Sequence, residues 1–206
     1  MKRLGLIGGS GWPSTLEYYR LLNTYYCEAV GPAHAMDMVI RNMDFDLFSQ
    51  LLNKGDKGSA VMMLVKGIKD CEKAGAEYFS FSANGLHRFL KDIEPLVSLP
   101  YVHIADATAK AVKDSGIKQV GLLGVKATMN ASFYPERLNQ FGIQTLTPSE
   151  EDKETVDQII FSELIQNSFL ETSKQKFLNI MESLKQKGAQ GIILGCTEIP
   201  LLIQQK

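Results

Sequence analysis

Short apolar runs alternate along the chain with longer stretches in which apolar residues recur at every third or fourth position. The short runs are typical of strands, and the recurring spacing is typical of amphipathic helices. The predicted strands are residues 3–9, 37–42, 77–82, a segment after Pro100, 118–124, 143–148 and 190–195. The predicted helices are residues 14–30, 57–74, 84–97, a segment near Asp106, a segment from Thr128, 153–169 and 173–188. Strands that alternate with helices in this way indicate parallel βαβ units, so we expect an α/β fold.

Several residues mark the predicted helix ends. Ser14 stands three residues before Glu17, the spacing of a capping box, so Ser14 is expected to cap the first helix. Asp106 is expected to cap a helix in the middle of the chain, and Thr128 to begin the next one. Gly75 is expected to end the helix before it, because glycine readily adopts the left-handed conformation that terminates helices.

One segment of the first half recurs near the end of the chain. The run KAGAEYFSFSANG resembles QKGAQGIILGCTE, since both contain a helix end, a Gly-Ala turn, a short apolar strand and a small polar tip. Ala83 and Cys196 occupy the same place in the two runs, 113 positions apart. Gly5 and Gly121 match in a second pair of segments, LGLIGG and VGLLGV, at an offset of 116.

Two matching pairs of segments in the same order predict an internal duplication. In each half a helix follows the glycine strand and carries an aromatic residue at the same place, Tyr18 and Tyr134. We therefore expect two similar α/β lobes, an N-terminal lobe over residues 1–98 and a C-terminal lobe over residues 99–206. Chance similarity between βα units is the alternative reading.

Composition and charge narrow the possible partners. The net charge is −1 and no basic block occurs, so nucleic acid and anionic membranes are not expected partners. No run of eighteen apolar residues occurs, and the first predicted strand follows Met1 almost directly, so neither a spanning segment nor a leader is expected. The three cysteines are too few and too scattered for a disulfide framework or a metal site. These features favour a cytoplasmic protein without a metal site.

The candidate chemistry lies where the predicted strands end. Ligands of open parallel sheets bind at the carboxyl ends of the strands. If the two halves face each other, Ala83 and Cys196 lie on opposite sides of one cleft. The residues around these ends are small and hydroxylic or amidic, which suits a carboxylate, so a small anionic substrate is expected. They are Ser10, Ser14, Thr15, Ser82, Asn84, Thr128 and Thr197.

Cys196 is the candidate reactive group. A thiol at a helix start is expected to have a lowered pKa, and it could attack a carbonyl or move a proton. A buried structural cysteine is the alternative, and it is the preferred reading for Cys27 and Cys71, which lie in helical apolar patterns. His87 could contact the cleft or serve packing, and the other two histidines read as structural. The run GGSG at residues 8–11 lacks the Lys-Ser/Thr of a phosphate loop, so a nucleotide site is not expected.

Five segments together resemble the aspartate/glutamate racemase family, which works without pyridoxal phosphate, and the branch specific for L-aspartate and L-glutamate above all. They are GLIGGSGWPSTLEYYRLLN, AGAEYFSFSANGLH, LPYVHIADAT, VGLLGVKATMNASFY and GAQGIILGCTEIPLL. The resemblance implies two pseudosymmetric lobes, each a mostly parallel sheet flanked by helices, with an active-site cleft between them. It also implies a homodimer that acts on a small dicarboxylic amino acid, aspartate or glutamate, without a cofactor.

In that family two cysteines face the substrate α-carbon from opposite sides, and one removes the proton that the other returns. By the resemblance, Cys196 is the acid/base of the second half, and Glu198 orients or deprotonates its thiol. Ala83 stands at the position of the first-half partner. The remaining positions carried over from the family hold or line the bound substrate. These are Ser10, Asn84, Gly85, Thr128, Met129 and Thr197.

Three departures from the family pattern affect this reading. Ala83 has no proton to give, Gly85 replaces a threonine that would hold the carboxylate, and the family's C-terminal segment has no counterpart after Lys206. The leading hypothesis is an amino-acid racemase, an isomerase, that is impaired or acts on one face only. The alternatives are a dicarboxylate-binding relative without catalysis and a single-cysteine decarboxylase of the arylmalonate type.

Overall fold

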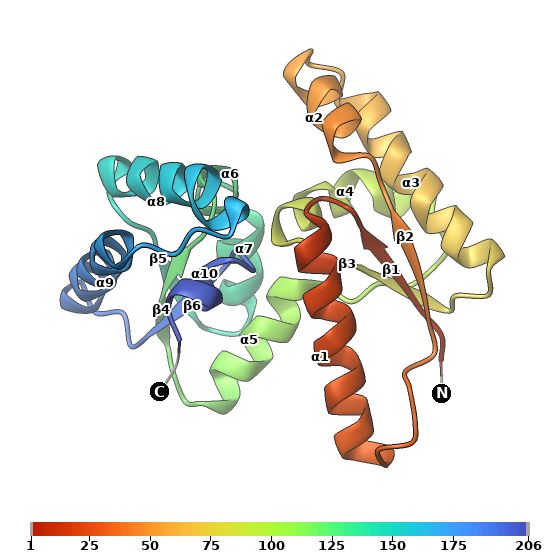
Figure 1. The fold of residues 1–206 in the computed structure, drawn as a ribbon, viewed down its shortest axis with the longest axis horizontal. Helices are drawn as coiled ribbons and strands as arrows, with labels where there is room; N and C mark the ends of the chain where they lie inside the picture. Colours follow the sequence, from red (N-terminus) through yellow and green to blue (C-terminus); the bar gives the residue numbers. More distant parts are fainter. Residues whose placement is uncertain (1, 205–206) are drawn as a thin grey trace. The chain divides into compact units, whose positions relative to one another are not determined.

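The computed structural model describes residues 2–204, and the chain divides into two compact units, Met1–His103 and Ile104–Lys206. Each unit is built on a three-stranded sheet in which all strands are parallel. The strand order is β2-β1-β3 in the first unit and β5-β4-β6 in the second, so the topology is the same (Figure 1). The prediction of an α/β fold with two similar, mostly parallel sheets flanked by helices is therefore confirmed.

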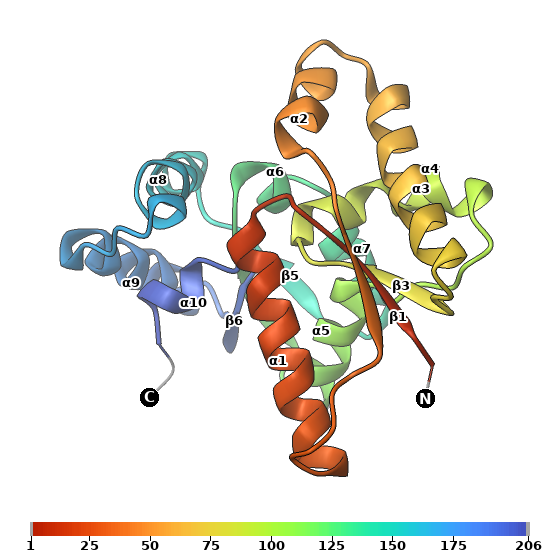
Figure 2. The ribbon, with the colours of Figure 1, turned by 45° about the vertical axis from the view of Figure 1, so that its right-hand side comes forward.

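The first unit places its central strand between two edge strands that follow it in the chain. Its register pairs Leu6 with Ile40 of β2 and with Ser80 of β3. Figure 1 and Figure 2 show α1 and α3 on opposite sides of this sheet. The elements are β1 (Leu4–Gly8), α1 (Trp12–Val30), β2 (Met38–Asn42), α2 (Phe45–Asn53), α3 (Lys57–Lys73), β3 (Tyr78–Phe81), a 3₁₀ helix (Asn84–Phe89), α4 (Leu90–Ile93) and a second 3₁₀ helix (Glu94–Leu96).

The second unit has helices on both faces of its sheet, and each face has a buried apolar cluster. One cluster lies under α5 and α7 and includes the fully buried Tyr134. The other lies under α8 and α9 and includes Phe177 and Leu184. The elements are α5 (Ile104–Asp114), β4 (Gln119–Leu123), α6 (Lys126–Met129), α7 (Phe133–Gln140), β5 (Gln144–Leu146), α8 (Glu150–Ser162), a 3₁₀ helix (Leu164–Gln166), α9 (Glu171–Gln186), β6 (Gly191–Leu194) and α10 (Ile199–Leu202).

The matching glycines of the sequence repeat have the same role in both units. A Cβ on Gly5 would lie 2.8 Å from the Cβ of Cys71 on α3, and a Cβ on Gly121 would lie 2.9 Å from Leu184 Cδ1 on α9. Cys71 and Leu184 are again 113 positions apart. In each unit, therefore, the helix before the last strand crosses the central strand at a glycine, because a side chain there would push the helix away.

Gly75 ends α3 as expected, with φ of +87°, but five of the predicted helix starts are wrong. The helices predicted from residues 153 and 173 begin at Glu150 and Glu171. α1 begins at Trp12, after Gly11, and Ser14 does not cap it, because Pro13 already fixes the first turn. α5 begins at Ile104, before Asp106. Thr128 lies inside the one-turn helix α6, which starts at Lys126. Two short helices, α2 and α10, were not predicted.

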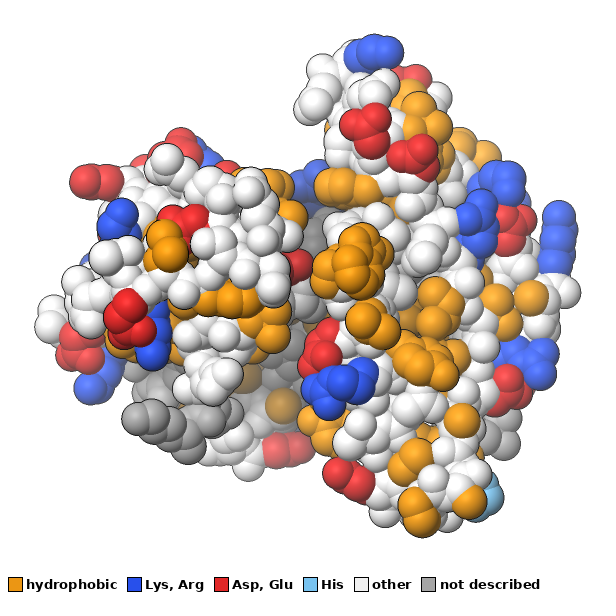
Figure 3. All heavy atoms as spheres, viewed as in Figure 1, with side chains coloured by type: hydrophobic (Ala, Val, Ile, Leu, Met, Phe, Trp, Pro, Cys, Tyr) orange, Lys and Arg blue, Asp and Glu red, His pale blue; other side chains and the backbone are white. Residues whose placement is uncertain are grey.

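α1 is anchored by its first turn and leaves large apolar side chains exposed. Ser14 and Thr15 are its buried residues, whereas Trp12 is 70% exposed and Leu16 is 56% exposed. Figure 3 shows apolar side chains gathered over α1. Across residues 2–204, none of the helices has both the length and the apolar character needed to cross a bilayer.

Candidate active site

Three hydroxyl groups join the start of α1 to the end of β3 in the first unit. Ser14 Oγ donates to the carbonyl of Ser82 at 2.8 Å, and Thr15 Oγ1 lies 3.0 Å from Ser82 Oγ. All three side chains are buried. The N–H of Ser82 donates to the carbonyl of Ile7 at 3.0 Å, which ties the same residue to the central strand. Ser82 therefore holds the backbone immediately before Ala83 in place.

The loop after β1 passes close to the backbone of the next segment. Gly9 has φ of +92°, and a Cβ there would lie 2.4 Å from the carbonyl oxygen of Met43, so only glycine fits. The N–H of Gly9 donates to Thr15 Oγ1 at 3.1 Å, which links this loop to the hydroxyl cluster. Ser10 follows directly and is half-buried.

Ala83 lies at the tip of β3 and has no group that can move a proton. Its backbone is extended, with φ of −143° and ψ of 131°, and its carbonyl accepts from the N–H of Leu86 at 3.3 Å. Its methyl group packs against the apolar core of the first unit. Asn84 and Gly85 follow in the first turn of the 3₁₀ helix, and both are half-buried. The candidate substrate contacts of this unit thus lie at the carboxyl ends of neighbouring strands.

Cys196 occupies the equivalent tip in the second unit. It stands two residues beyond the end of β6, as Ala83 stands two residues beyond the end of β3. The preceding Gly195 donates its N–H to the carbonyl of Leu123 on β4 at 2.5 Å, the same connection that Ser82 makes. Ala83 and Cys196 are therefore structural counterparts, each within its own unit.

Glu198 accepts hydrogen bonds from the two residues before it, Cys196 and Thr197. Cys196 Sγ donates to Glu198 Oε2 at 2.9 Å, and Thr197 Oγ1 donates to the same oxygen at 2.8 Å. All three residues are half-buried. The carboxylate is thus placed to accept the proton of the thiol, and it also restrains the hydroxyl of Thr197.

The expectation of a lowered pKa at Cys196 is wrong. Burial raises the pKa of the Cys196 thiol well above its usual value, and the negative charge of Glu198 raises it further. The four-residue helix α10 is too short to offset these effects through its dipole. The resting thiol is therefore protonated, a form suited to donating a proton.

Thr128 packs against the glycines that follow β4 and β6, Gly124 and Gly195. It is 1% exposed, and within residues 2–204 no group forms a hydrogen bond with its hydroxyl oxygen. A Cβ on Gly195 would lie 2.9 Å from the carbonyl oxygen of Leu123, and one on Gly124 would lie 3.0 Å from that of Gly195. Because these two residues are glycines, the chain after β4 and the chain after β6 can approach each other, and Thr128 packs against both glycines. Met129, the next residue, is buried in the apolar core.

His87 and His103 are paired, which their separation in the sequence does not reveal. Their ring centroids are 4.8 Å apart, both side chains are buried, and Phe81 meets His87 edge to face. A bridge between Phe79 and Tyr101 brings the two segments together. Among the described residues, no group of three or more His, Cys, Asp or Glu side chains is arranged to hold a metal ion.

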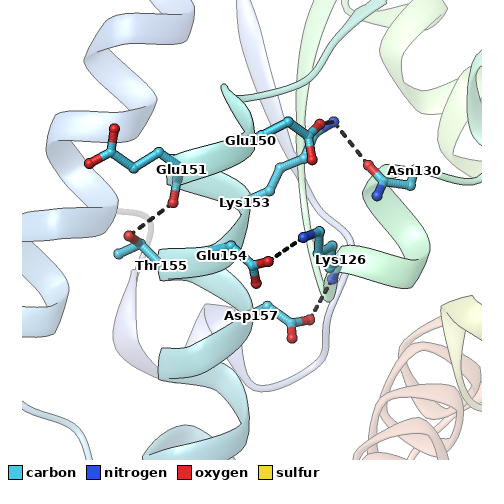
Figure 4. A network of polar contacts seen from close by, with 8 residues as sticks. All are labelled: Lys126, Asn130, Glu150, Glu151, Lys153, Glu154, Thr155 and Asp157. Atoms are coloured by element: carbon cyan, nitrogen blue, oxygen red, sulfur yellow. Dashed lines mark hydrogen bonds and ion pairs between the residues drawn. The ribbon is translucent and has the colours of Figure 1, made fainter.

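Sequence reasoning missed a polar network around α6 (Figure 4). Asp157 on α8 accepts from the N–H of Lys126, and Lys153 on α8 donates to Asn130. The signal for it was the recurrence of charged residues at helical spacing, at position 150 just before the predicted helix and at positions 153, 154 and 157 within it. The network holds both ends of the segment that carries Thr128.

A family model and several solved structures match this chain. A family model described as Asp/Glu/Hydantoin racemase matches residues 7–206. The crystal structure of a Yersinia pestis protein assigned to the Asp/Glu racemases is 41% identical, with a TM-score of 0.92 over 99% of this chain and 89% of that one. An aspartate racemase homologue from Pyrococcus horikoshii is 34% identical, with a TM-score of 0.85 over 100% of this chain and 89% of that one.

Another similar protein is the broad specificity amino-acid racemase RacX of Bacillus subtilis. It is 22% identical over 199 residues, which cover 95% of this chain and 85% of that protein. The aspartate racemase of Picrophilus torridus shares the fold, with 21% identity, a TM-score of 0.75, and coverage of 99% of this chain and 84% of that one.

Proposed function

Because the chain belongs to the Asp/Glu/hydantoin racemase family, we propose that it is an isomerase-type enzyme that acts on the α-carbon of aspartate or glutamate. Cys196 is the group that exchanges the α-proton, and no cofactor takes part. The family and the names of the relatives support the racemase class. The observation that carries the assignment of Cys196 is its hydrogen bond to Glu198 at a strand tip.

The proposed chemistry begins with transfer of the thiol proton to Glu198, which already accepts a hydrogen bond from it. The thiolate then removes the α-proton, and the electron pair of the broken C–H bond spreads into the α-carboxylate. The re-formed thiol can return its proton to the same face, which restores the substrate. If protonated Glu198 first releases its proton to water, it can take the substrate-derived proton from the thiol. A proton from solvent then reaches the sulfur by the same path, and the thiol delivers it to the α-carbon.

The α-carboxylate of the substrate needs donors, because negative charge develops on it as the proton leaves. We assign this role to Asn84 and Thr197, with Ser10 and Gly85 lining the site. The hydroxyl of Thr197 donates to Glu198 in the resting protein, so it must turn from Glu198 to the substrate. We assign the same role to Thr128, because its buried hydroxyl has no hydrogen-bond partner within the described part of the chain. Met129 contributes to the wall behind it. This arrangement requires the tips of both units to meet one substrate, which is part of the proposal.

Because Ala83 has no proton to give, the proposed reaction moves a proton on one face of the α-carbon only. Inversion needs a proton donor on the face opposite Cys196, and a methyl group cannot provide one. Loss of a positioned acid or base typically costs about 10²–10⁴-fold in rate. We therefore expect exchange of the α-proton to be faster than inversion of configuration.

The test is to incubate L- and D-aspartate, and L- and D-glutamate, with the protein in D₂O. Deuterium at Cα is followed by NMR, and configuration by chiral chromatography. Exchange with little inversion in one enantiomer is the expected result, and its loss in Cys196→Ser assigns the thiol. Absence of exchange in all four substrates would remove the proposed function.

One observation favours a second candidate, a decarboxylase that uses a single thiol. The pKa of Cys196 is raised by burial and by Glu198, which suits protonation of a carbanion that loss of carbon dioxide has generated. Release of carbon dioxide from 2-aryl-2-methylmalonate distinguishes this candidate from the racemase.

A dicarboxylate-binding protein without catalysis predicts no turnover of any substrate. It also predicts that Cys196→Ser leaves the affinity for aspartate unchanged, which calorimetry measures. The homodimer and the cytoplasmic location expected from the resemblance and the composition remain predictions. Sedimentation equilibrium of the purified chain tests the first, and fractionation of cells that express it tests the second.

A further inference from the structure

The helix α8 holds the segment around Thr128 at both ends (Figure 4). Asp157 Oδ1 accepts from the backbone N–H of Lys126 at 2.6 Å, and Lys153 Nζ donates to Asn130 Oδ1 at 2.9 Å. Lys126 and Asn130 stand two residues before and two residues after Thr128. The ammonium of Lys126 also pairs with Glu154 on the same helix.

α6 cannot hold this geometry without help. A single helical turn fixes several backbone angles for few hydrogen bonds, so it is unstable in isolation. Its first N–H groups have no partner within the helix, and a carboxylate at that end satisfies one of them with a charge-assisted bond. Asp157 provides that carboxylate from a separate helix, so the start of α6 depends on α8.

Lys153 holds the other end of the segment, at Asn130. Its side chain is only 9% exposed, and its ammonium donates to Asn130 and to Glu150 Oε1 at 2.7 Å. A buried ammonium is costly unless it keeps its acceptors, so these bonds fix where Lys153 and Asn130 lie. The two anchors thus restrain a segment whose central residue, Thr128, is buried with its Cβ and methyl group against Gly124 and Gly195.

We propose that Asp157 and Lys153 are positioning residues that hold Thr128 and its backbone in the arrangement that receives the substrate carboxylate. The step from a restrained segment to substrate binding rests on the proposed function. The restraint of the segment by Asp157 and Lys153 does not rest on the proposed function. The experiment therefore measures the restraint and the binding of substrate separately.

Asp157→Ala removes the acceptor and the charge, and Asp157→Asn removes the charge but keeps an acceptor oxygen. Thr155→Val is the matched control, because Thr155 lies on the side of α8 turned away from α6 and its hydroxyl donates to the carbonyl of Glu151 within the helix (Figure 4). Lys153→Met tests the second anchor, and Lys153→Arg keeps its donors.

The first readout is hydrogen exchange of the amides of residues 126–129 in the protein without substrate. We expect Asp157→Ala to speed this exchange by about tenfold or more, Asp157→Asn to have a small effect, and Thr155→Val to have none. Lys153→Met is expected to speed exchange in the same segment, and Lys153→Arg to restore protection. Unchanged exchange in Asp157→Ala would overturn the proposal, whatever the substrate.

The second readout is KM against kcat for α-proton exchange. Removal of a negative charge near the site by itself favours an anionic substrate and lowers KM. Loss of positioning predicts the opposite, a KM raised by about tenfold in Asp157→Ala, with Asp157→Asn close to the parent. A lowered or unchanged KM in Asp157→Ala contradicts the positioning role. Failure of the parent chain to exchange any substrate removes the proposed function but leaves the first readout intact.

Discussion

Cys196 and Glu198 share one hydrogen bond, with Sγ 2.9 Å from Oε2. Cys196 stands two residues beyond the end of β6, and its counterpart beyond the end of β3 is Ala83. The carboxylate has two opposing effects on the thiol. Its charge raises the pKa of Cys196, and its oxygen offers a place for the proton to go. The chemistry proposed for this chain depends on how these effects balance.

Glu198→Gln is predicted to separate the two effects. Glutamine keeps an acceptor oxygen but loses the charge, so the pKa of Cys196 falls and the thiolate is more abundant near neutral pH. Alkylation of Cys196 by iodoacetamide, followed at the peptide level between pH 6 and pH 10, should therefore begin at a lower pH in the variant. The half-buried Cys27 serves as the internal control.

The same variant should lose α-proton exchange, because glutamine cannot take the thiol proton. A variant that gains thiol reactivity and keeps full exchange would show that Glu198 only depresses the reactivity of the thiol. It would also remove the proton path from the proposed reaction.

The raised pKa of Cys196 predicts a loss of stability at alkaline pH. Below about pH 8.5 the thiol is protonated in both the folded and the unfolded chain, so it adds no pH dependence. Above this pH the unfolded chain releases the proton and the folded chain retains it, so the unfolded state binds fewer protons. The free energy of unfolding then falls as pH rises, by up to about 1.4 kcal/mol per pH unit from this group.

Urea unfolding under reducing conditions at pH 7.5 and pH 10 measures that slope. Cys196→Ala is the control, and it should flatten the alkaline part of the profile. Equal slopes in the parent and the variant would mean that the thiol ionises with the same pKa in both states.

Ala83→Cys and Ala83→Thr are predicted to restore inversion. Ala83 stands where its counterpart Cys196 stands in the second unit, and its side chain is half-buried, so a sulfur or hydroxyl fits the position with small adjustment. The rate of inversion should rise by about 10²–10⁴-fold, while exchange on the Cys196 face changes little. Chiral chromatography of both enantiomers of aspartate and glutamate measures it, with Ala83→Ser as a smaller hydroxyl for comparison.

A gain for one enantiomer only identifies the substrate that the site prefers. An unchanged rate in both variants would indicate that the tip of β3 does not face the α-carbon. In that case the proposed pairing of the two tips is wrong, even though the exchange at Cys196 stands.

The parts of the molecule that could be predicted are those with local signals. The matching glycines Gly5 and Gly121 marked both central strands, because close packing of a helix against a strand leaves the same gap in the side-chain pattern. α2 was missed although Asp44 caps it by accepting from the N–H of Leu47, because its short apolar run resembles a loop between longer elements.

The errors at the site came from contacts between distant parts of the chain. Thr128 resembles a helix start, but Asp157, twenty-nine positions later, caps α6 at Lys126 instead. The pKa of Cys196 depends on how deeply the tip is buried, which the residue spacing does not contain. Local patterns therefore identified the strand tips, and only the folded structure gave their hydrogen bonds and electrostatics.

The hydroxyl cluster at the start of α1 is predicted to stabilise the fold through Thr15. Thr15→Val keeps the shape of the side chain but removes the oxygen that accepts from the N–H of Gly9 and pairs with Ser82 Oγ. Because the cluster is buried, both partners lose a bond that water cannot easily replace, at a cost of about 1–3 kcal/mol. Thr24→Val is the matched control, since Thr24 lies on the same helix but is exposed and donates to the carbonyl of Arg20. Urea unfolding should show a clear loss of stability for Thr15→Val and little change for Thr24→Val, and equal effects would mean that the cluster contributes no more than an ordinary helix position.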